Sequence, residues 1–162
     1  MKKPKLFLFL YTSLITLLLT GCYHPIKKYL VNLEQYPNLV ITNWDILESQ
    51  DEIKKYLKDQ YTLYSAYNVK KIIFQEITTS NYQRIIIEIF QTKSKMDAMN
   101  LYRRYSFINQ VTIGDAGSES SGFLAFYRGE FFVKIYIKGY LKNSNEIIRE
   151  LAKQIDIKLK LR

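Results

Sequence analysis

The sequence predicts an α+β domain with three helices and a mostly antiparallel sheet of about five to six strands. Residues 69–78 and 82–91 both favour strands and follow each other across a short polar turn, a pattern typical of an antiparallel hairpin. Segments with helical spacing begin near residues 49, 94 and 143. The pattern lacks the regular strand–helix alternation of a parallel sheet, and the predicted order is α-β-β-α-β-β-β-α-β.

The first predicted helix begins at a capping box, shortly after Trp44, the only tryptophan. The hydroxyl of Ser49 and the carboxylate of Glu52 can each satisfy a free backbone N–H at the helix start. Apolar residues then follow near helical spacing, with a slip around residue 60: Ile53, Tyr56, Leu57, Leu63, Tyr64 and Tyr67. The hairpin of residues 69–78 and 82–91 comes next.

The second half of the chain repeats these signals. Ser94 opens a second helix, whose predicted buried stripe is Ala98, Leu101, Tyr102 and Tyr105. A short strand around 111–113 leads into a glycine- and serine-rich loop, 114–122.

A second hairpin is predicted from residues 123–127 and 131–138. Asn143 with Glu146 predicts the start of a third helix, which is expected to end near Gln154. The tail, residues 155–162, alternates between apolar and polar side chains, and this period predicts a final strand.

The N-terminus has the proportions of a secretory signal peptide, with a basic start and an uncharged apolar run over residues 6–19. As a helix this run would span only about 21 Å, short of the ~30 Å core of a membrane. Residues 19–22, Leu-Thr-Gly-Cys, resemble a bacterial lipobox.

The lipobox resemblance implies a covalent lipid anchor. A signal peptidase would recognise Leu19, Thr20 and Gly21 and cut before Cys22, whose thiol would carry a diacylglyceryl group and whose new amino group would take an N-acyl chain. Two or more acyl chains anchor a protein stably, at ~0.8 kcal/mol per buried methylene. The alternative is a buried structural cysteine behind an ordinary signal peptide.

These features divide the chain into three parts. Residues 1–21 are the predicted signal peptide, 22–41 a lipidated tether and 42–162 a single domain. Fully extended, some 18 residues of this tether would span at most ~60 Å. Whether part of it, such as residues 29–31, packs on the domain is left open.

The composition limits the kinds of partner and cofactor that the protein can have. The formal charge of +9 falls to +6 when the signal peptide, with its three lysines, is removed. An exported basic domain does not meet cytoplasmic nucleic acid, so its polyanionic partners would be envelope components. The lysines are scattered, however, which favours a solvated surface. One cysteine allows no internal disulfide, and with His24 beside the lipid it leaves no metal-ligand cluster, so neither metal nor cofactor is predicted.

Several short stretches resemble a known family. Residues 64–69, 87–90, 97–102, 113–114 and 124–134 (YSAYNV, IEIF, DAMNLY, IG and LAFYRGEFFVK) are similar to the uncharacterised prokaryotic family "domain of unknown function 6599" over about residues 42–140. Asp59 and Gln60 stand where that family carries adjacent glycines. The resemblance implies an exported domain with no assigned activity, and therefore lends no catalytic residue.

The strands predict a candidate binding face. Residue alternation places isoleucines on one face of each central strand and aromatic and basic residues on the other. If helices cover the isoleucines, the opposite face offers a tentative binding surface made of Tyr82, Arg84, Phe90, Phe132, Lys134 and Tyr136. The alternative is an ordinary exposed sheet face, or one covered by the tether.

The leading hypothesis is a membrane-anchored, extracytoplasmic lipoprotein of the bacterial cell envelope that binds a protein or envelope component without catalysis. No phosphate-binding loop or nucleophile motif occurs in the sequence, and His24 is its only histidine. A carrier of a small apolar or anionic ligand, held in a cavity between helices and sheet, is the alternative. An enzyme built on carboxylates is a third.

Overall fold

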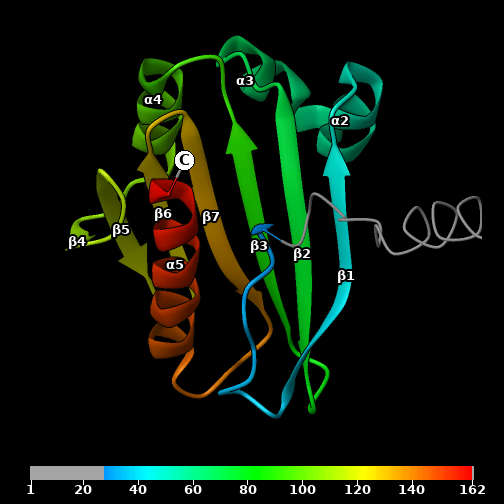
Figure 1. The fold of residues 1–162 in the computed structure, drawn as a ribbon, viewed down its shortest axis with the longest axis vertical. Helices are drawn as coiled ribbons and strands as arrows, with labels where there is room; N and C mark the ends of the chain where they lie inside the picture. The colour runs from blue at the N-terminus through cyan, green and yellow to red at the C-terminus, as the bar shows by residue number, and fades with distance from the viewer. Residues whose placement is uncertain (1–27, 162) are drawn as a thin grey trace, which may run out of the picture.

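A seven-stranded antiparallel sheet is the framework of residues 28–161, the part of the chain that the computed structural model describes (Figure 1). Its strands are β1 (Leu39–Leu47), β2 (Lys71–Thr79), β3 (Arg84–Gln91), β4 (Asn109–Val111), β5 (Ala116–Ser120), β6 (Phe123–Arg128) and β7 (Phe131–Lys138). Their order in the sheet is β1-β2-β3-β7-β6-β5-β4. The predicted lipidation and cleavage residues, Leu19 to Cys22, lie outside the described residues.

The sheet consists of two antiparallel meanders, β1–β3 and β4–β7. The helix α4 (Lys95–Tyr105) connects them and the chain returns so that β7 pairs with β3. In this register Glu88 lies directly opposite Lys134, and Phe90 opposite Phe132. The pairing joins residues that are far apart in the sequence at the centre of the sheet.

One face of the sheet, here called the α5 face, is closed by the long helix α5 (Ser144–Lys160). The buried stripe of this helix is Ile148, Leu151, Ala152, Ile155 and Leu159, at helical spacing. It packs on aliphatic residues of the central strands, among them Ile87, Val133 and Ile135, which are fully buried.

The chain before β1 covers the rest of the α5 face. Tyr29 and Val31 are buried there, and the buried side chain of Gln75 in β2 holds both through their backbones. Its amide nitrogen donates to the Tyr29 carbonyl at 3.0 Å, and its amide oxygen accepts from the Val31 N–H at 3.3 Å. Gln154 of α5 makes the same kind of bonds with Asn32. Much of the predicted tether is therefore part of the domain, and its boundary at residue 41 falls inside β1.

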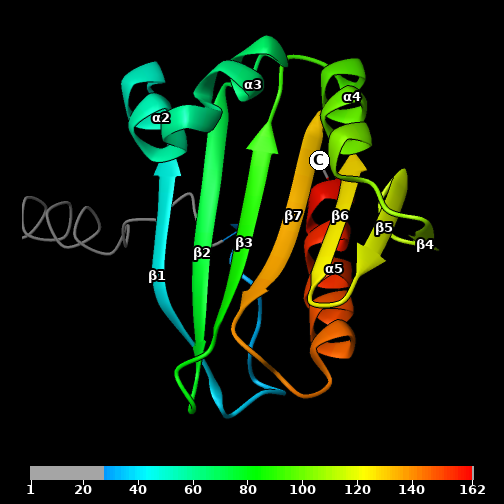
Figure 2. The same ribbon diagram turned by 180° about the vertical axis from the view of Figure 1, so that it is seen from behind.

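The opposite face, here called the second face, is covered over only part of its length (Figure 2). The helices α2 (Gln50–Leu57) and α3 (Tyr61–Ala66), separated by the 3₁₀ turn η2 (Lys58–Gln60), lie with α4 at one end of the sheet. Beneath them an aromatic core forms from Tyr64, Phe90, Tyr102 and Phe132, among others. The other end of this face carries no helix.

Most local predictions are confirmed. The α+β class is correct, although the sheet has seven strands rather than five to six. The capping box is present at Ser49, the slip near residue 60 is the turn η2, and Ser94 caps α4. Both predicted hairpins form, as β2–β3 and β6–β7. Part of the loop predicted at 114–122 is the strand β5.

The predicted final strand is wrong, because α5 continues through Lys160. Ile155 and Leu159 fit a helical stripe with Leu151 as well as they fit an alternating strand, and no glycine or proline interrupts the helix. Ile157, which strand alternation would place with them, is 60% exposed. The predicted start of this helix at Asn143 is confirmed, since Asn143 is its N-cap residue, but Asn143 adopts φ 57° and its side chain makes no cap hydrogen bond.

Candidate functional site

An open pocket of about 470 Å³ lies where the helical layer of the second face ends. Its rim comes from the end of α2 and from η2, and its floor from β2, β3 and β7. The floor carries both charge signs beside aromatic rings: Phe74, Glu76, Ile86, Glu88, Lys134, Tyr136 and Lys138. Tyr56, Lys58 and Asp59 contribute from the rim.

At the base of the pocket Glu88 and Lys134 form a buried ion pair. The Lys134 Nζ lies 2.9 Å from the Glu88 Oε2, and the two residues are 4% and 8% exposed. The contact is electrostatic rather than a well-aligned hydrogen bond, since Glu88 Oε2 accepts no hydrogen bond from the described residues. Removing two charges from water costs several kcal/mol per ion, which their attraction offsets only in good geometry.

Tyrosine hydroxyls complete the surroundings of this pair. The Tyr56 hydroxyl donates to Glu88 Oε1 at 2.6 Å, and the Lys134 ammonium donates to the Tyr64 hydroxyl at 2.9 Å. The Tyr64 and Tyr105 hydroxyls lie 2.8 Å apart. The network therefore joins α2, α3 and α4 to the central strands.

Aromatic rings surround the Lys134 ammonium. Its Nζ lies between 5.3 and 5.8 Å from the ring centroids of Tyr64, Phe90, Tyr105 and Tyr136. Cation–π attraction at these distances adds to the ion pair, because both interactions favour the charged amine. The Lys134 side chain is therefore held between the Glu88 carboxylate and these rings.

The tyrosines of the pocket remain protonated. Burial raises the pKa of the Tyr56 hydroxyl, and the charge of Glu88 and their hydrogen bond raise it further. The pKa of Tyr136 is raised in the same way by burial and then by Glu88. Burial, followed by the bond to Tyr105, raises the pKa of Tyr64. Each hydroxyl is therefore a neutral hydrogen-bonding group at physiological pH.

The structure brings half of the sequence-predicted face to this pocket. Lys134 and Tyr136 line it, and Arg84 lies beside it at 3.7 Å from the carboxylate of Glu76. Phe90 and Phe132 are fully buried beneath the helices, so their placement on an open surface is corrected. Tyr82 lies in the β2–β3 turn with φ 59° and is 87% exposed.

Sequence reasoning missed Glu88, Glu76, Tyr56 and Phe74 as pocket residues. Glu88 and Lys134 each stand as a lone charge within an apolar strand, and this is the signal that could have linked them. A lone charge that faces a core needs a partner of opposite sign.

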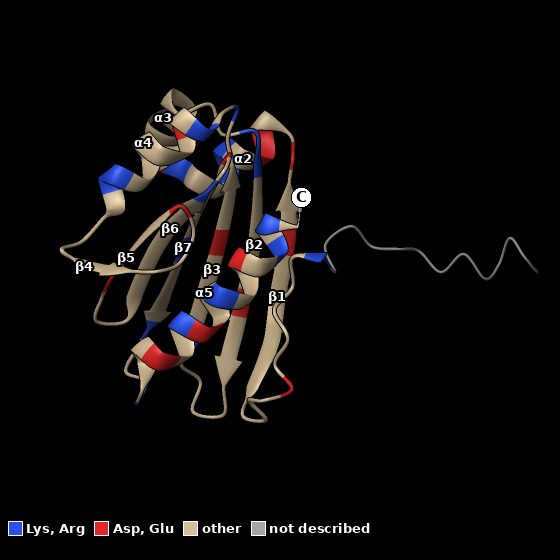
Figure 3. Ribbon diagram, turned by 60° about the vertical axis from the view of Figure 1, so that its left-hand side comes forward, with Lys and Arg blue, Asp and Glu red and all other residues tan. Residues whose placement is uncertain are grey.

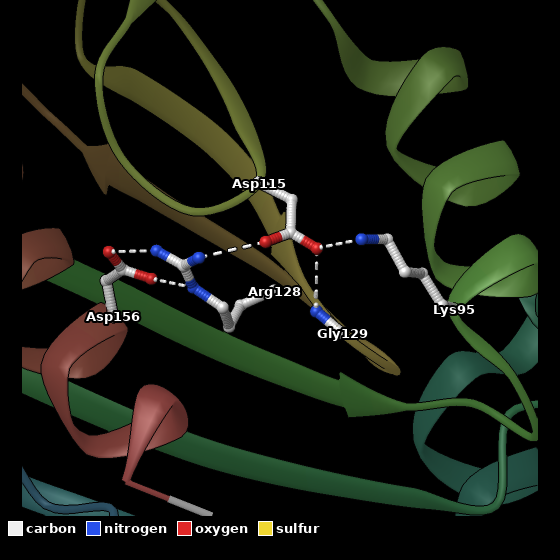
Figure 4. Close-up of polar contacts among 5 residues, drawn as sticks. All are labelled: Lys95, Asp115, Arg128, Gly129 and Asp156. Carbon is white, nitrogen blue, oxygen red and sulfur yellow. Dashed lines mark hydrogen bonds and ion pairs between the residues drawn. The ribbon is translucent and has the colours of Figure 1, made fainter.

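A second polar cluster lies at the helix-covered end of the molecule (Figure 4). Arg128 binds Asp156 of α5 through two bonds, Nε–Oδ1 at 2.7 Å and NH2–Oδ2 at 2.8 Å, and reaches Asp115 at 2.8 Å. Asp115 also contacts Lys95 of α4 at 2.7 Å and accepts from the Gly129 N–H at 3.2 Å. Every charge here has a protein partner, so the cluster serves to tie α4 and α5 to the β6–β7 turn.

Two glutamates are among the residues that line the pocket. Both contact cations, Lys134 for Glu88 and Arg84 for Glu76. Among residues 28–161 no group of three histidine, cysteine, aspartate or glutamate side chains is placed to hold a metal ion. Within the same range no helix is long and apolar enough to cross a membrane.

No family model, curated protein or solved structure matches the chain. The similarity to the domain of unknown function 6599 therefore stays a prediction.

Proposed function

We propose that this protein is a lipid-anchored binding module of the bacterial cell envelope, and that its pocket engages a partner protein. The lipobox resemblance at residues 19–22 supports the anchor. The observation that carries the binding role is the uncovered half of the second face, where aromatic and charged side chains line an open pocket of about 470 Å³. Helices cover the other end of this face, whereas here tyrosines and the buried ion pair line an open pocket.

The balance of charges indicates what the pocket accepts. Lys58, Lys134 and Lys138 face Asp59, Glu76 and Glu88, so the two signs occur in equal number. A polyanion is attracted by a field of one sign, and this pocket does not provide one. We therefore expect a partner surface that presents both charges and an aromatic or hydroxyl group, rather than a wall polymer or lipopolysaccharide.

A carrier of a small ligand is the second candidate, and the pocket volume favours it. Ligand sites commonly measure ~300–1,000 Å³. The pocket between η2 and the sheet falls in this range at about 470 Å³. A small zwitterion would match the paired charges. A purely apolar ligand would displace water from these charges without replacing its hydrogen bonds.

In-cell photo-crosslinking tests the proposal. A photoreactive residue replaces Tyr136, which lines the pocket, in a strain that keeps Cys22. The matched control replaces Ile108, which is 97% exposed beside β4, three strand positions from β7. A reproducible protein adduct at Tyr136 alone, lost in a Glu76→Lys background, is the expected result. Small-molecule adducts would favour the carrier instead, and equal adducts at both positions, or none, would overturn a binding role for the pocket.

A further inference from the structure

The C-terminal half of α5 exposes apolar side chains among lysines. Ile157 is 60% exposed and Leu161 is 83% exposed, and their spacing of four residues places them one turn apart. Lys153 and Lys160 are exposed beside them, and Lys158 is half-buried. We call these five residues the α5 patch.

Among the described residues, Lys158 and Lys160 of the patch have no ion-pair partner, whereas Lys153 lies 3.4 Å from the carboxylate of Glu150 in an exposed pair. Asp156 lies within this stretch of helix but is bound to Arg128. The acids Glu146 and Glu150 belong to the other half of α5 (Figure 3). Lysines in a last turn do favour a helix terminus, but this gives no reason for two large apolar residues to face water beside them. Apolar residues flanked by lysines are the composition of helices that lie on anionic lipid surfaces.

The start of the described chain lies on the same side of the sheet as the α5 patch. Tyr29, at the start of the described chain, and Leu159, at the end of α5, belong to one core cluster. The described chain begins on the α5 face at the level of the C-terminal half of the helix (Figures 1 and 3). The bonds from Gln75 fix this point to the sheet.

The remaining chain is too short to let the domain turn over. Six residue steps separate Cys22 from Lys28, and they reach at most ~22 Å when fully extended. A domain of this length is roughly 35 Å across. Because the tether is shorter than the domain is wide, the side that faces the membrane is the side where the tether attaches.

We infer that the α5 patch rests on the anionic headgroups of the membrane that holds the Cys22 lipid. The lysines contact the headgroups, and Ile157 and Leu161 enter the interface. The pocket lies on the opposite face of the sheet, so this orientation presents it to the envelope space. The inference rests on the proposed lipid anchor.

The experiment uses the acylated full-length lipoprotein in vesicles of phosphatidylcholine and phosphatidylglycerol. Cys22 is the only cysteine and is blocked by its lipid, so an introduced thiol is labelled uniquely. An environment-sensitive fluorophore is attached to the Ile157→Cys variant, and to Ile108→Cys as the exposed control. We expect lipid-borne quenchers to reduce the emission at position 157 at least threefold more than at 108.

Charge reversal separates the patch from the anchor. The triple variant Lys153→Glu, Lys158→Glu, Lys160→Glu should remove the quenching at position 157 while the protein still floats with the vesicles. Flotation with equal quenching at 157 and 108, or with unchanged quenching in the triple variant, would overturn the orientation and leave the anchor standing. Loss of flotation in the parent protein would instead refute the lipid anchor, and with it this inference.

Discussion

The two faces of the sheet are built from the same strands but differ in how they are closed. On the α5 face one long amphipathic helix and the segment before β1 cover aliphatic side chains, and Ile85, Ile87 and Ile89 of β3 are all fully buried there. On the second face, α2, α3 and α4 cover one end only. There β3 changes from Phe90, fully buried, to Glu88 in its ion pair and then to the exposed Arg84.

Within one sheet, the α5 face therefore contributes mainly to stability, whereas the second face carries the proposed binding site. Aliphatic burial on the α5 face supplies the non-directional driving force of folding, at roughly 25 cal/mol per Å². At the border of the helical layer on the second face, a charged pair is held by four rings and a tyrosine network. Apolar residues at that boundary would avoid the cost of desolvating two charges. We therefore expect that the ion pair and its tyrosines are retained for binding.

The largest effect is expected from breaking the ion pair on one side. Glu88→Leu leaves the Lys134 ammonium buried with no carboxylate partner, since the two side chains are only 5% and 10% exposed. We expect a loss of about 3–5 kcal/mol in the free energy of unfolding, measured by chemical denaturation at neutral pH. Lys134→Met added to Glu88→Leu should restore most of that loss.

The matched control is the exposed pair of Lys153 and Glu150, whose removal should change the free energy of unfolding by less than about 1 kcal/mol. A double variant at positions 88 and 134 that stays as unstable as Glu88→Leu would show that the pocket depends on packing around the pair and not on charge compensation.

Neighbouring isoleucines of β3 allow the two faces to be compared directly. Ile87 points into the closed α5 face, whereas Ile86 lines the pocket, and both are nearly fully buried. Ile87→Ala should cost about 3–4 kcal/mol because it leaves a sealed cavity. Ile86→Ala should cost about 1 kcal/mol less, since water can enter the enlarged pocket. Equal losses in denaturation would mean that the pocket is as tightly closed as the core.

Elements with local signals could be predicted from sequence. The Ser49–Glu52 capping box, the Ser94 cap and the two hairpin turns act between residues within a few positions of each other. The end of α5 could not be decided locally, because Ile155 and Leu159 fit both a helical and an alternating period. The hydrophobic surface of β6 and β7 beneath the helix decided it.

The candidate site was predictable only in part, for the same reason. Alternation along β7 correctly groups Lys134 with Tyr136, but it also groups them with Phe132, which α3 and α4 cover. The pairing of Glu88 with Lys134 needs β7 to lie beside β3, and α4 and the strands β4 to β6 separate these two strands along the chain. Local sequence patterns therefore cannot show that Glu88 and Lys134 are neighbours.

The cluster that ties the two helical layers together predicts a pH dependence. Burial raises the pKa of the Asp115 carboxyl, but hydrogen bonds from Lys95 and Gly129 and the charges of Lys95 and Arg128 outweigh it and hold the pKa below its usual value. The stabilisation is therefore present above the unfolded pKa of about 3.9 and is lost as the pH falls through the folded pKa.

Asp115→Asn should accordingly lower the free energy of unfolding by about 1–2 kcal/mol at neutral pH. The difference from the parent protein should begin to shrink below about pH 4 and disappear once the pH has fallen through the folded pKa, where the parent carboxyl is itself protonated. Unfolding curves of both proteins between neutral pH and pH 2 measure it, and a difference that does not vary with pH would contradict the assigned charge role.

The smallest effects are expected where the helices begin, and they distinguish the two faces once more. At the start of α2, on the second face, the Ser49 Oγ accepts from the Glu52 N–H, so Ser49→Ala should cost about 1 kcal/mol. At the start of α5 the Asn143 side chain makes no cap bond and its φ of 57° suits glycine, so Asn143→Gly should change stability by less than about 0.5 kcal/mol. Thermal unfolding of Ser49→Ala and Asn143→Gly measures these two changes in stability, and Ser49→Asp, which keeps a hydrogen-bond acceptor, is the control.

The same two variants should differ in crosslinking. Because α2 forms the rim of the pocket, Ser49→Ala should weaken crosslinking at Tyr136. Asn143→Gly, which lies beyond the opposite face, should leave the crosslinking unchanged.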